Sequence, residues 1–345
     1  MLSEVIHERA EQAIKERIFP GCVVGIIRTD GLREIIPVGT LDGHASVQED
    51  TLYDLASITK SIPLASLALT LAAENPGRLP GRFNLPGKVV EYLPELQNDH
   101  GATIEDLLRY RVTGPRLSQL GFKTFEEIRT YVFEHGFDGP AGDGAYTNLP
   151  AFLLGVIVER VTGEILPALA NRYFFEPLGM HDTSFFPVVP NTSNSTGRQN
   201  LMCFDNNIAP TEIVDGVEIR GIVHDESARH FARARRAVGH AGLFSTVPDL
   251  LDFVEAMLGG KLPLVVEGAQ RGLGWEVNRE WMGSFSSRSG LAVFGKTGFT
   301  GTSILCDIER KIGLVILSNR TYPHRPRDNS AINAFRKDIA DIVFG

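Results

Sequence analysis

The sequence has few of the residues that mark specialised protein classes. Only three of its 345 residues are cysteines, and Cys22, Cys203 and Cys306 form neither a C-x-x-C pair nor a disulfide framework. Basic residues are outnumbered by acidic ones, 34 to 42, and the net charge of −8 argues against nucleic-acid or membrane-surface binding. The longest apolar runs, such as residues 64–73, fall far short of the roughly 20 residues of a transmembrane helix. We therefore expect neither a nucleic-acid partner nor a membrane span.

The first residues show no secretory signal either. The stretch MLSEVIHERAEQAIKERIF is mixed in charge and amphipathic, without a basic start, an apolar run or a small-residue cleavage site. Together with the scarce cysteines, this predicts a cytoplasmic protein. A periplasmic or secreted protein whose leader is missing from the sequence would look the same.

Both ends of the chain carry short strand patterns next to a helix pattern. Helices are predicted at 3–18 and 329–344, each with apolar residues at helical spacing. Between them, runs rich in β-branched and aliphatic residues predict strands at 22–28, 34–38, 291–298, 302–308 and 312–318. The pattern predicts an antiparallel sheet that is assembled from both chain ends and flanked by the terminal helices.

The middle of the chain is mostly helical in pattern. Thr103-x-x-Asp106 and Thr124-x-x-Glu127 resemble capping boxes before apolar-periodic runs. Long loops are expected at 74–94, which is rich in proline, and at 187–210, which is rich in Asn, Thr and Ser. The predicted class is therefore α+β, as a single domain with an α/β lobe at about 1–56 and 265–345 and a mainly helical lobe at about 57–264.

The segment Tyr53-Asp-Leu-Ala-Ser57-Ile-Thr-Lys60 carries the first candidate chemistry. If Ser57 starts a helix, Lys60 lies one turn later on the same face, within reach of the serine oxygen. A serine hydroxyl is a weak nucleophile that needs a neighbouring base, and a lysine can serve when burial lowers its pKa. Alone, the pattern is weak evidence of catalysis, and an N-cap serine followed by a surface lysine explains it better.

Two further segments carry side chains that could take part in catalysis or substrate binding. Tyr146-Thr-Asn148 precedes an apolar helix, where the phenol can face a cleft and the amide can donate and accept hydrogen bonds. Lys296-Thr297-Gly298 places a cation and a hydroxyl on an edge strand, and Gly298 lets a ligand approach the backbone. Lysine and threonine together suit a substrate carboxylate. Taken separately, the segments also fit a half-buried aromatic with a capping Asn, and an ordinary strand followed by a glycine turn.

The three motifs occur once each, in the order Ser-x-x-Lys, Tyr-x-Asn, Lys-Thr-Gly, in a chain with only eight lysines and seven tyrosines. In this the sequence resembles the penicillin-recognising serine hydrolases, the superfamily of class C β-lactamases, D-Ala-D-Ala peptidases and family VIII carboxylesterases. Longer sequence segments also resemble the class C branch of this superfamily, namely YTNLPAFLLGVIVERVTGE, FFEPLGMHDTSF, GHAGLFST, GLGWEV and DIERKIGLVILSNR. The resemblance implies a β-lactamase/transpeptidase-like fold.

The resemblance also implies a role for each matched residue. Ser57 would be the acylated nucleophile, and Lys60 and Tyr146 would share its proton and later activate the hydrolytic water. Asn148 would hold the amide side chain of the substrate, and Lys296 and Thr297 would anchor a carboxylate or polarise Tyr146. The backbone N–H groups of Ser57 and Phe299 would form the oxyanion hole. No metal or organic cofactor is implied.

The sequence departs from the family pattern in two places. Many members read His-Thr-Ser-Gly where this chain has Tyr110-Arg-Val-Thr-Gly114, and a glycine-rich stretch is replaced by ARHFARARRAVGH. We read the arginines at 229–236 as a solvated helix face rather than a contact for an acidic partner. The histidines around His224 and His240 match no zinc signature, so we expect no metal site, although His240 could approach the cleft.

These observations predict a β-lactamase-like serine hydrolase that cleaves ester or β-lactam bonds of small carboxylate-bearing substrates. The alternatives are a D-Ala-D-Ala carboxypeptidase or penicillin-binding protein, and a non-hydrolytic sensor that uses the cleft for recognition. The absent export signal weighs against cell-wall substrates, and the intact motif set weighs against a sensor. A small-molecule substrate is the one partner expected, with the chain a monomer or weak homo-oligomer.

Overall fold

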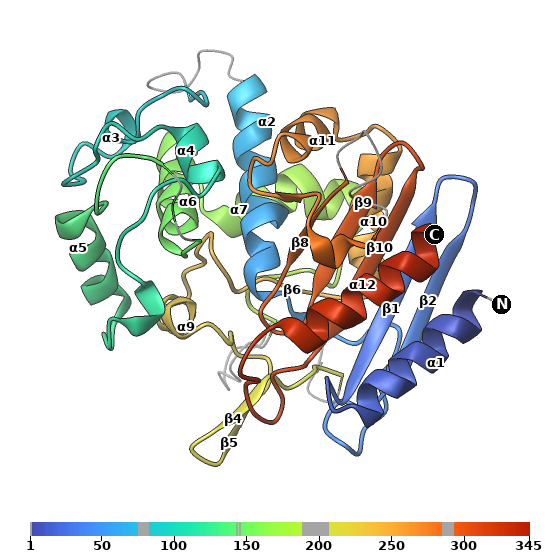
Figure 1. The fold of residues 1–345 in the computed structure, drawn as a ribbon. Coiled ribbons are helices and arrows are strands. Elements are labelled where there is room, and N and C mark those ends of the chain that lie inside the picture. The colour runs from blue at the N-terminus through green and yellow to red at the C-terminus, as the bar shows by residue number, and fades with distance from the viewer. Residues whose placement is uncertain (1, 75–82, 143, 145, 188–206, 285–292) are drawn as a thin grey trace, which may run out of the picture.

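The main sheet has six antiparallel strands in the order β2-β1-β10-β9-β8-β7 (Figure 1). The computed structural model describes residues 2–74, 83–142, 144, 146–187, 207–284 and 293–345. The strands of this sheet are β1 (Gly21–Arg28), β2 (Arg33–Gly39), β7 (Glu276–Val277), β8 (Phe294–Thr297), β9 (Ser303–Asp307) and β10 (Ile312–Ser318). Their order confirms the α+β class and the sheet built from both chain ends. The edge strand β7 was not predicted.

Strand β1 lies at the junction of the two chain ends. It pairs with β2 through the predicted hairpin and with β10 over seven residues, with Val24 opposite both Ile36 and Ile316. Cys22 on β1 and Cys306 on β9 are free and buried. Cys203 lies outside the described residues.

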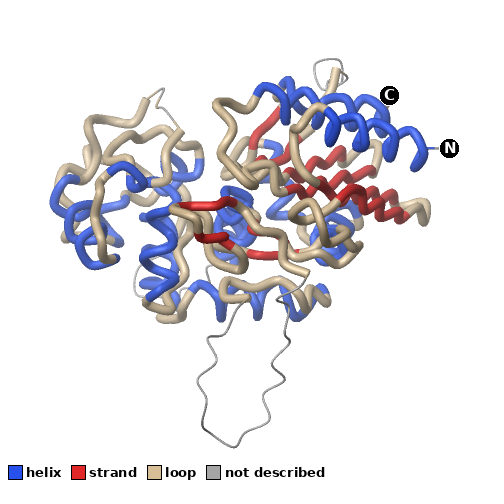
Figure 2. Tube along the Cα trace, turned by 90° about the horizontal axis from the view of Figure 1, so that it is seen from below, coloured by secondary structure: helices blue, strands red, loops and turns tan. Residues whose placement is uncertain are grey.

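Two terminal helices cover one face of the sheet (Figure 2). Helix α1 (Leu2–Lys15) and helix α12 (Ser330–Phe344) close a separate hydrophobic core, in which the Phe19 and Phe335 rings meet edge to face with centroids 4.9 Å apart. Both helices were predicted within a few residues. The second core, on the other face, is much larger and continues into the helical part of the molecule.

The helical elements between β2 and β7 lie mostly beside the sheet (Figure 1). They are α2 (Ser66–Glu74), α3 (Val89–Tyr92), α4 (Ile104–Leu108), α5 (Phe125–His135), α6 (Leu149–Thr162), α7 (Leu166–Ala170), α8 (Glu176–Leu178), α9 (Glu226–Arg233), α10 (Val247–Leu258) and α11 (Pro263–Gln270). Short 3-10 or π turns are η1 (Ala56–Lys60), η2 (Ser61–Ala65), η3 (Leu117–Gln119), η4 (Asn171–Phe175) and η5 (Glu280–Met282). The predicted capping boxes at Thr103 and Thr124 are both formed.

Two small sheets complete the fold, and neither was predicted. Strand β3 (Tyr53–Asp54) pairs with β6 (Phe244–Ser245) directly before η1, and β4 (Glu212–Val214) forms a hairpin with β5 (Val217–Ile219). Residues 75–82 of the first predicted long loop and residues 188–206, most of the second, lie outside the described part. The short helix α3 lies within the first of these loops.

The run Ala56–Glu74 is long and apolar enough to cross a membrane, judged by length and composition alone. Within the fold, 78% of its most apolar window is buried inside the protein. It contains η1, η2 and α2 and forms part of the larger hydrophobic core. Burial of this kind is typical of the core helix of a folded domain, which passes the same composition test.

Helix α10 lies close to the sheet because two strand residues opposite it are glycines. A Cβ on Gly25 of β1 would meet Val247 Cγ1 at 2.3 Å, and a Cβ on Gly313 of β10 would meet Val254 Cγ1 at 2.1 Å. Both distances are far below a normal carbon contact. The two glycines therefore determine how closely α10 approaches the sheet. Helix α10 directly follows β6, which pairs with β3, the strand before η1.

Replacing Gly313 by alanine should destabilise the protein. The new methyl group overlaps Val254, and overpacking of a filled core typically costs about 1–3 kcal/mol. We expect a lower midpoint in urea unfolding followed by circular dichroism. Gly139→Ala is the matched control, because a Cβ there meets nothing within 4 Å. Equal midpoints for the two variants would contradict this account of the packing.

Candidate active site

Ser57 and Lys60 lie on the single 3-10 turn η1, which continues into η2 and α2. In a 3-10 helix, residues three apart lie directly above one another, so this geometry suits Ser-x-x-Lys better than an α-helix would. The Lys60 Nζ donates a hydrogen bond to Ser57 Oγ over 2.7 Å. The prediction that the two side chains share a face is confirmed, although the element is a 3-10 turn.

A buried aspartate holds the turn from the strand before it. Ala56 has φ +47°, a left-handed conformation that non-glycine residues rarely adopt, and its N–H donates to Asp54 Oδ1 over 2.8 Å. The other carboxylate oxygen of Asp54 accepts from the His224 N–H over 2.7 Å. Burial raises the pKa of Asp54 to about 6, although these two N–H groups act in the opposite direction. Asp54 thereby ties the start of the serine turn to the segment of His224, which also lines the cleft.

Lys60 is buried, with 1% of its surface exposed. Its Nζ makes a second hydrogen bond, to the backbone oxygen of His240 over 2.7 Å. Among the described residues, no carboxylate lies within salt-bridge distance of this amine. Burial lowers the pKa of Lys60 below its ordinary value, and the nearby charge of Lys296 contributes in the same direction. A lysine with a lowered pKa is suited to accept a proton from the serine hydroxyl.

Tyr146 lies between the two lysines of the motifs. The centre of its ring is 5.4 Å from Lys60 Nζ and 4.7 Å from Lys296 Nζ. Desolvation alone would raise the pKa of the phenol, but the charges of Lys296 and Lys60, together with an interaction with Ser57, outweigh it. The pKa of Tyr146 therefore lies below its ordinary value. Ser57, Lys60 and Tyr146 meet in one place, as the sequence predicts.

Tyr110 forms the wall of the site where the sequence departs from the family pattern. Its ring lies against that of Tyr146, with centroids 4.9 Å apart, and its centre is 5.2 Å from Lys296 Nζ. Burial raises the pKa of Tyr110 well above its ordinary value, so its hydroxyl stays protonated. Tyr110 thus acts as a neutral aromatic support for Tyr146 and Lys296.

Glu276 reaches the Lys-Thr-Gly motif from the edge strand β7. One of its carboxylate oxygens is 3.4 Å from Lys296 Nζ and accepts from Thr297 Oγ1 over 3.4 Å. The other accepts from Trp281 Nε1 over 2.8 Å, which fixes the carboxylate in position. The cation and the hydroxyl that were expected to bind a substrate carboxylate therefore already share a carboxylate of the protein.

Asn148 joins a polar cluster that extends from the wall of the cleft into the interior. Its Nδ2 donates to Asp225 Oδ2 over 2.9 Å, while Asp225 Oδ1 accepts from Ser227 Oγ over 2.6 Å. The fully buried His240 ring has its Nε2 2.9 Å from Ser227 Oγ and 3.4 Å from Asp225 Oδ1. Burial lowers the pKa of His240, which favours its neutral form. His240 therefore borders the site through its backbone oxygen, which accepts from Lys60.

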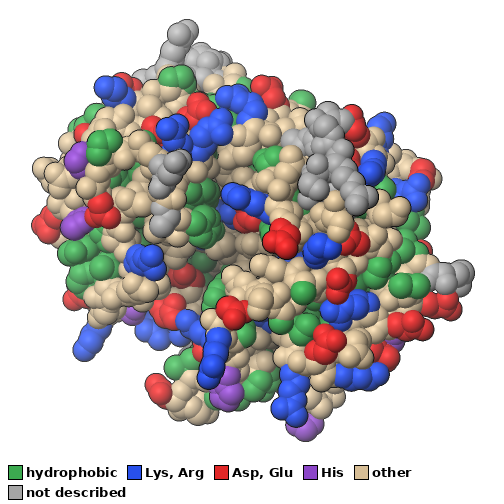
Figure 3. All heavy atoms as spheres, viewed as in Figure 1, with side chains coloured by type: hydrophobic (Ala, Val, Ile, Leu, Met, Phe, Trp, Pro, Cys, Tyr) green, Lys and Arg blue, Asp and Glu red, His purple; other side chains and the backbone are tan. Residues whose placement is uncertain are grey.

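A cleft of about 460 Å³ opens in front of these side chains. The face shown in Figure 3 is hollowed near its centre, with basic and acidic side chains around the hollow. Ser57, Tyr146 and Asn148 line the cleft on one side, and Thr297, Gly298 and Phe299 line it on another. A Cβ on Gly298 would lie 2.4 Å from the backbone oxygen of Leu55, so a side chain there would force strand β8 away from the serine turn.

Two arginines support the Phe299 side of the cleft. The buried Arg336 of α12 donates to the backbone oxygens of Gly298 and Thr302, over 3.2 and 2.7 Å. Arg320 donates to the backbone oxygen of Phe299 over 2.9 Å. Within the described part of the chain, the N–H groups of Ser57 and Phe299 have no protein acceptor, and both residues line the cleft. Backbone N–H groups without a protein acceptor at a cleft are the kind of donor that an oxyanion hole uses.

Several of these residues were not identified from the sequence, namely Asp54, Tyr110, Asp225, Glu276, Arg320 and Arg336. Glu276 could have been found, because it belongs to the segment GLGWEV that resembles the family. In the structure it lies opposite Gly295 in the β7–β8 pair. The arginines at 229–236 have mixed surroundings rather than one solvated face. Arg229 donates to the backbone oxygens of Val223 and His224. Over the described residues, no group of three His, Cys, Asp or Glu is placed to hold a metal ion.

Comparisons with known proteins give a consistent result. The family model described as Beta-lactamase matches residues 6–337. A protein of Escherichia coli (strain K12) named "Putative D-alanyl-D-alanine carboxypeptidase" is 28% identical over 324 residues, which is 80% of this chain and 70% of that protein.

Solved structures agree in fold at lower sequence identity. A beta-lactamase/D-alanine carboxypeptidase from Pseudomonas syringae superposes with a TM-score of 0.72 at 20% identity, covering 97% of this chain and 98% of that one. A D-amino acid amidase from Ochrobactrum anthropi gives 0.72 at 18% identity, with 99% and 97% covered.

The Lys296→Ala variant should shift the acidic limb of the pH–rate profile to higher pH. The charge of Lys296 lowers the pKa values of both Lys60 and Tyr146, so its removal raises both, whichever of them accepts the proton. The base must be deprotonated to work, and activity is lost as pH falls through its pKa. The measurement is kcat/KM for a neutral chromogenic ester across pH, with the surface variant Lys337→Ala as control. A limb that stays in place or moves to lower pH would exclude this electrostatic role.

Proposed function

Because the chain belongs to the beta-lactamase family, we propose that it is a serine hydrolase that forms an acyl-enzyme on Ser57. Its family membership confirms the resemblance seen in the sequence. The observation that carries the proposal is the 2.7 Å hydrogen bond between a buried lysine with a lowered pKa and the serine hydroxyl. A serine hydroxyl is a weak nucleophile, and it is activated by a base within hydrogen-bond distance.

In the proposed acylation, the Ser57 proton passes to the Lys60–Tyr146 pair as Oγ bonds to the substrate carbonyl carbon. The developing negative charge on the carbonyl oxygen is stabilised by the N–H groups of Ser57 and Phe299, and each such donor contributes roughly 3–4 kcal/mol in the transition state. The proton then passes to the leaving group as its bond to the carbonyl carbon breaks. Deacylation repeats the sequence with water as the nucleophile, which restores the free serine and releases the acid.

The substrate class depends on the state of Lys296. A free lysine and threonine on an edge strand would favour carboxylate-bearing substrates, which include β-lactams and peptides ending in D-Ala. Glu276 lies against both groups and offsets the charge of Lys296. We therefore place esters and other acyl substrates without a carboxylate ahead of β-lactams, with weaker β-lactam turnover.

Two other functions remain as alternatives. A D-Ala-D-Ala carboxypeptidase would bind a terminal carboxylate, and the names of the sequence relatives support it, but the Glu276 contact opposes it. A non-hydrolytic penicillin-binding sensor would acylate without turnover. The cytoplasmic location and the monomeric or weakly oligomeric state also remain proposals.

The Ser57→Ala variant should lose turnover of both a chromogenic ester and a chromogenic cephalosporin, by at least about a thousandfold. Intact-protein mass spectrometry of the unmodified protein, after exposure to an activated ester and to a penicillin, should show one acyl adduct that Ser57→Ala lacks. Unchanged rates in Ser57→Ala would reject the nucleophile. A stable adduct without turnover would favour the sensor.

The Glu276→Gln variant should gain activity on carboxylate-bearing substrates relative to neutral esters. Removing one negative charge beside Lys296 leaves its cation free for the substrate, and we expect about a three- to tenfold rise in the ratio of kcat/KM values. The glutamine oxygen can still accept from Trp281. Glu280→Gln, an exposed position on the neighbouring turn η5, is the matched control. A ratio that is unchanged or falls would show that Glu276 does not set substrate charge preference.

A further inference from the structure

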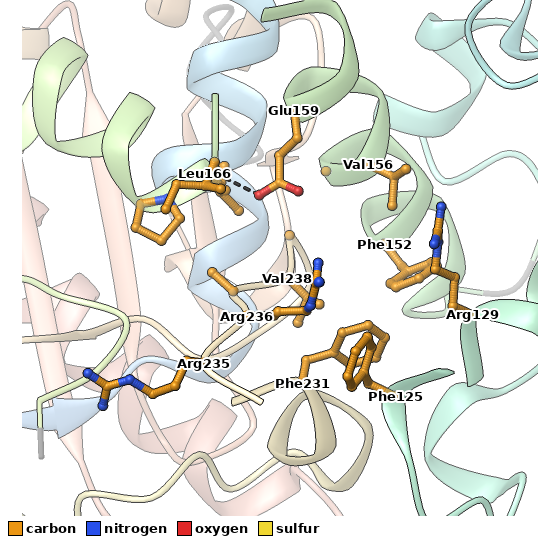
Figure 4. A pocket seen from close by; sticks show the side chains of 15 residues that line it. Phe125, Arg129, Phe152, Val156, Glu159, Leu166, Phe231, Arg235, Arg236 and Val238 are labelled. Atoms are coloured by element: carbon orange, nitrogen blue, oxygen red, sulfur yellow. Dashed lines mark hydrogen bonds between the residues drawn. The ribbon is translucent and has the colours of Figure 1, made fainter. Parts of the chain in front are cut away.

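A second cavity, of about 240 Å³, lies on the helical side of the molecule (Figure 4). Its walls come from α5, α6, the start of α7, the end of α9 and residues 235–239. It shares no lining residue with the catalytic cleft. A volume of this size fits a molecule with one ring and a short side chain.

Most of the cavity wall is apolar and aromatic. The Phe231 ring lies between those of Phe125 and Phe152, with centroids 5.5 and 5.4 Å away, and Val156 and Leu166 face the same space (Figure 4). Phe152 and Phe231 are buried, so the wall they form belongs to the core and does not depend on a mobile surface side chain. An apolar surface of this kind would bind a flat ring by burial and edge-to-face contact.

Arginines supply the charge of the cavity. Arg129 from α5, together with Arg235 and Arg236 after α9, lines it, and none of them has a carboxylate within salt-bridge distance among the described residues. The Arg236 guanidinium lies over the Phe125 ring, 5.0 Å from its centre, and Figure 4 shows Arg236 at the middle of the cavity while Arg235 points away from it. Arg236 and Arg129 therefore remain available to an anion.

One acidic side chain, Glu159 of α6, also lines the cavity. One of its oxygens already accepts from the Leu166 N–H over 2.7 Å (Figure 4). Burial raises the pKa of Glu159, which weakens its repulsion of an anion. With Arg236 and Arg129 against this single carboxylate, the cavity is positive overall.

We propose that this cavity binds a small aryl carboxylate, with its ring among Phe125, Phe152 and Phe231 and its carboxylate on Arg236 and Arg129. Each requirement of such a ligand meets a matching feature: an aromatic wall of limited size, and unpaired guanidinium groups that can bind a carboxylate with two hydrogen bonds each. A purely apolar ligand would leave the arginines unused, and a small inorganic anion would leave the aromatic wall uncovered.

The cavity also borders the backbone that holds Lys60. Its lining includes Gly239, the residue before His240, and the Phe152 ring is 6.2 Å from the ring of His240. A Cβ on Gly239 would lie 2.5 Å from the backbone oxygen of Ala151, so this segment is packed tightly between the cavity and Lys60. A ligand in the cavity would therefore contact the reverse side of the segment whose carbonyl orients the amine.

The test uses 3-phenylpropionate as the probe and 3-phenylpropanamide as its uncharged match, titrated into the full-length protein by isothermal titration calorimetry. We expect saturable binding of the carboxylate and at least about tenfold weaker binding of the amide, because a charge-assisted contact is lost. The double variant Arg129→Gln, Arg236→Gln should weaken carboxylate binding by about tenfold or more. Arg233→Gln, an exposed position at the end of α9, should bind as the unmodified protein does.

Lys296→Ala distinguishes this cavity from the catalytic site, where Lys296 was expected to bind a substrate carboxylate. Binding that persists in Lys296→Ala and weakens in the arginine double variant supports the proposal. Val156→Trp, which fills the cavity without removing a charge, should abolish binding while ester turnover shows that the variant is folded. Three outcomes would overturn the proposal: no saturation up to about 10 mM probe, equal affinity for acid and amide, or binding that depends on Lys296 and not on the arginines.

Discussion

The architecture of the site depends on burying the amine of Lys60 at a place where none of the described residues puts a carboxylate within salt-bridge distance. An isolated ammonium is costly to remove from water, so burial favours the neutral amine and lowers its pKa. Among the described residues, Ser57 Oγ and the backbone oxygen of His240 accept hydrogen bonds from Lys60 and fix the direction of its amine, and neither acceptor carries a charge. The charges of Lys296 and Lys60 also lower the pKa of Tyr146, so its phenol gives up its proton more easily than a phenol in water.

Much of the fold and of the motif chemistry could be predicted because the relevant signals are local. The terminal helices, the first hairpin and the capping boxes depend on residues within a turn or two of one another. The Ser57–Lys60 contact is also local, because it needs only a helical turn. That Tyr146 and Lys296 join this turn from about 90 and 240 residues away could be expected only from the family resemblance, since neither periodicity nor composition specifies the meeting of distant segments.

The residues that were missed act through tertiary contacts that have no local pattern. Glu276 belongs to a strand of two residues, too short to show an alternating pattern, and its effect comes from pairing with β8. Asp54 and Asp225 are acidic side chains in ordinary loop or strand contexts, and only the fold shows that backbone N–H groups and Ser227 satisfy them in the interior. The 3-10 form of η1 depends in the same way on Asp54, through the N–H of Ala56.

The pairing of β1 with β10 has a consequence for the order in which the protein becomes active during synthesis. Strand β1 leaves the ribosome early, but its partner is made almost 290 residues later, together with β8 and its lysine. Until then a nascent chain carries the turn of Ser57 without the strand that faces it across the cleft. Hydrolytic competence would therefore arise only near the completion of translation, so partially synthesised chains would be unable to consume substrate.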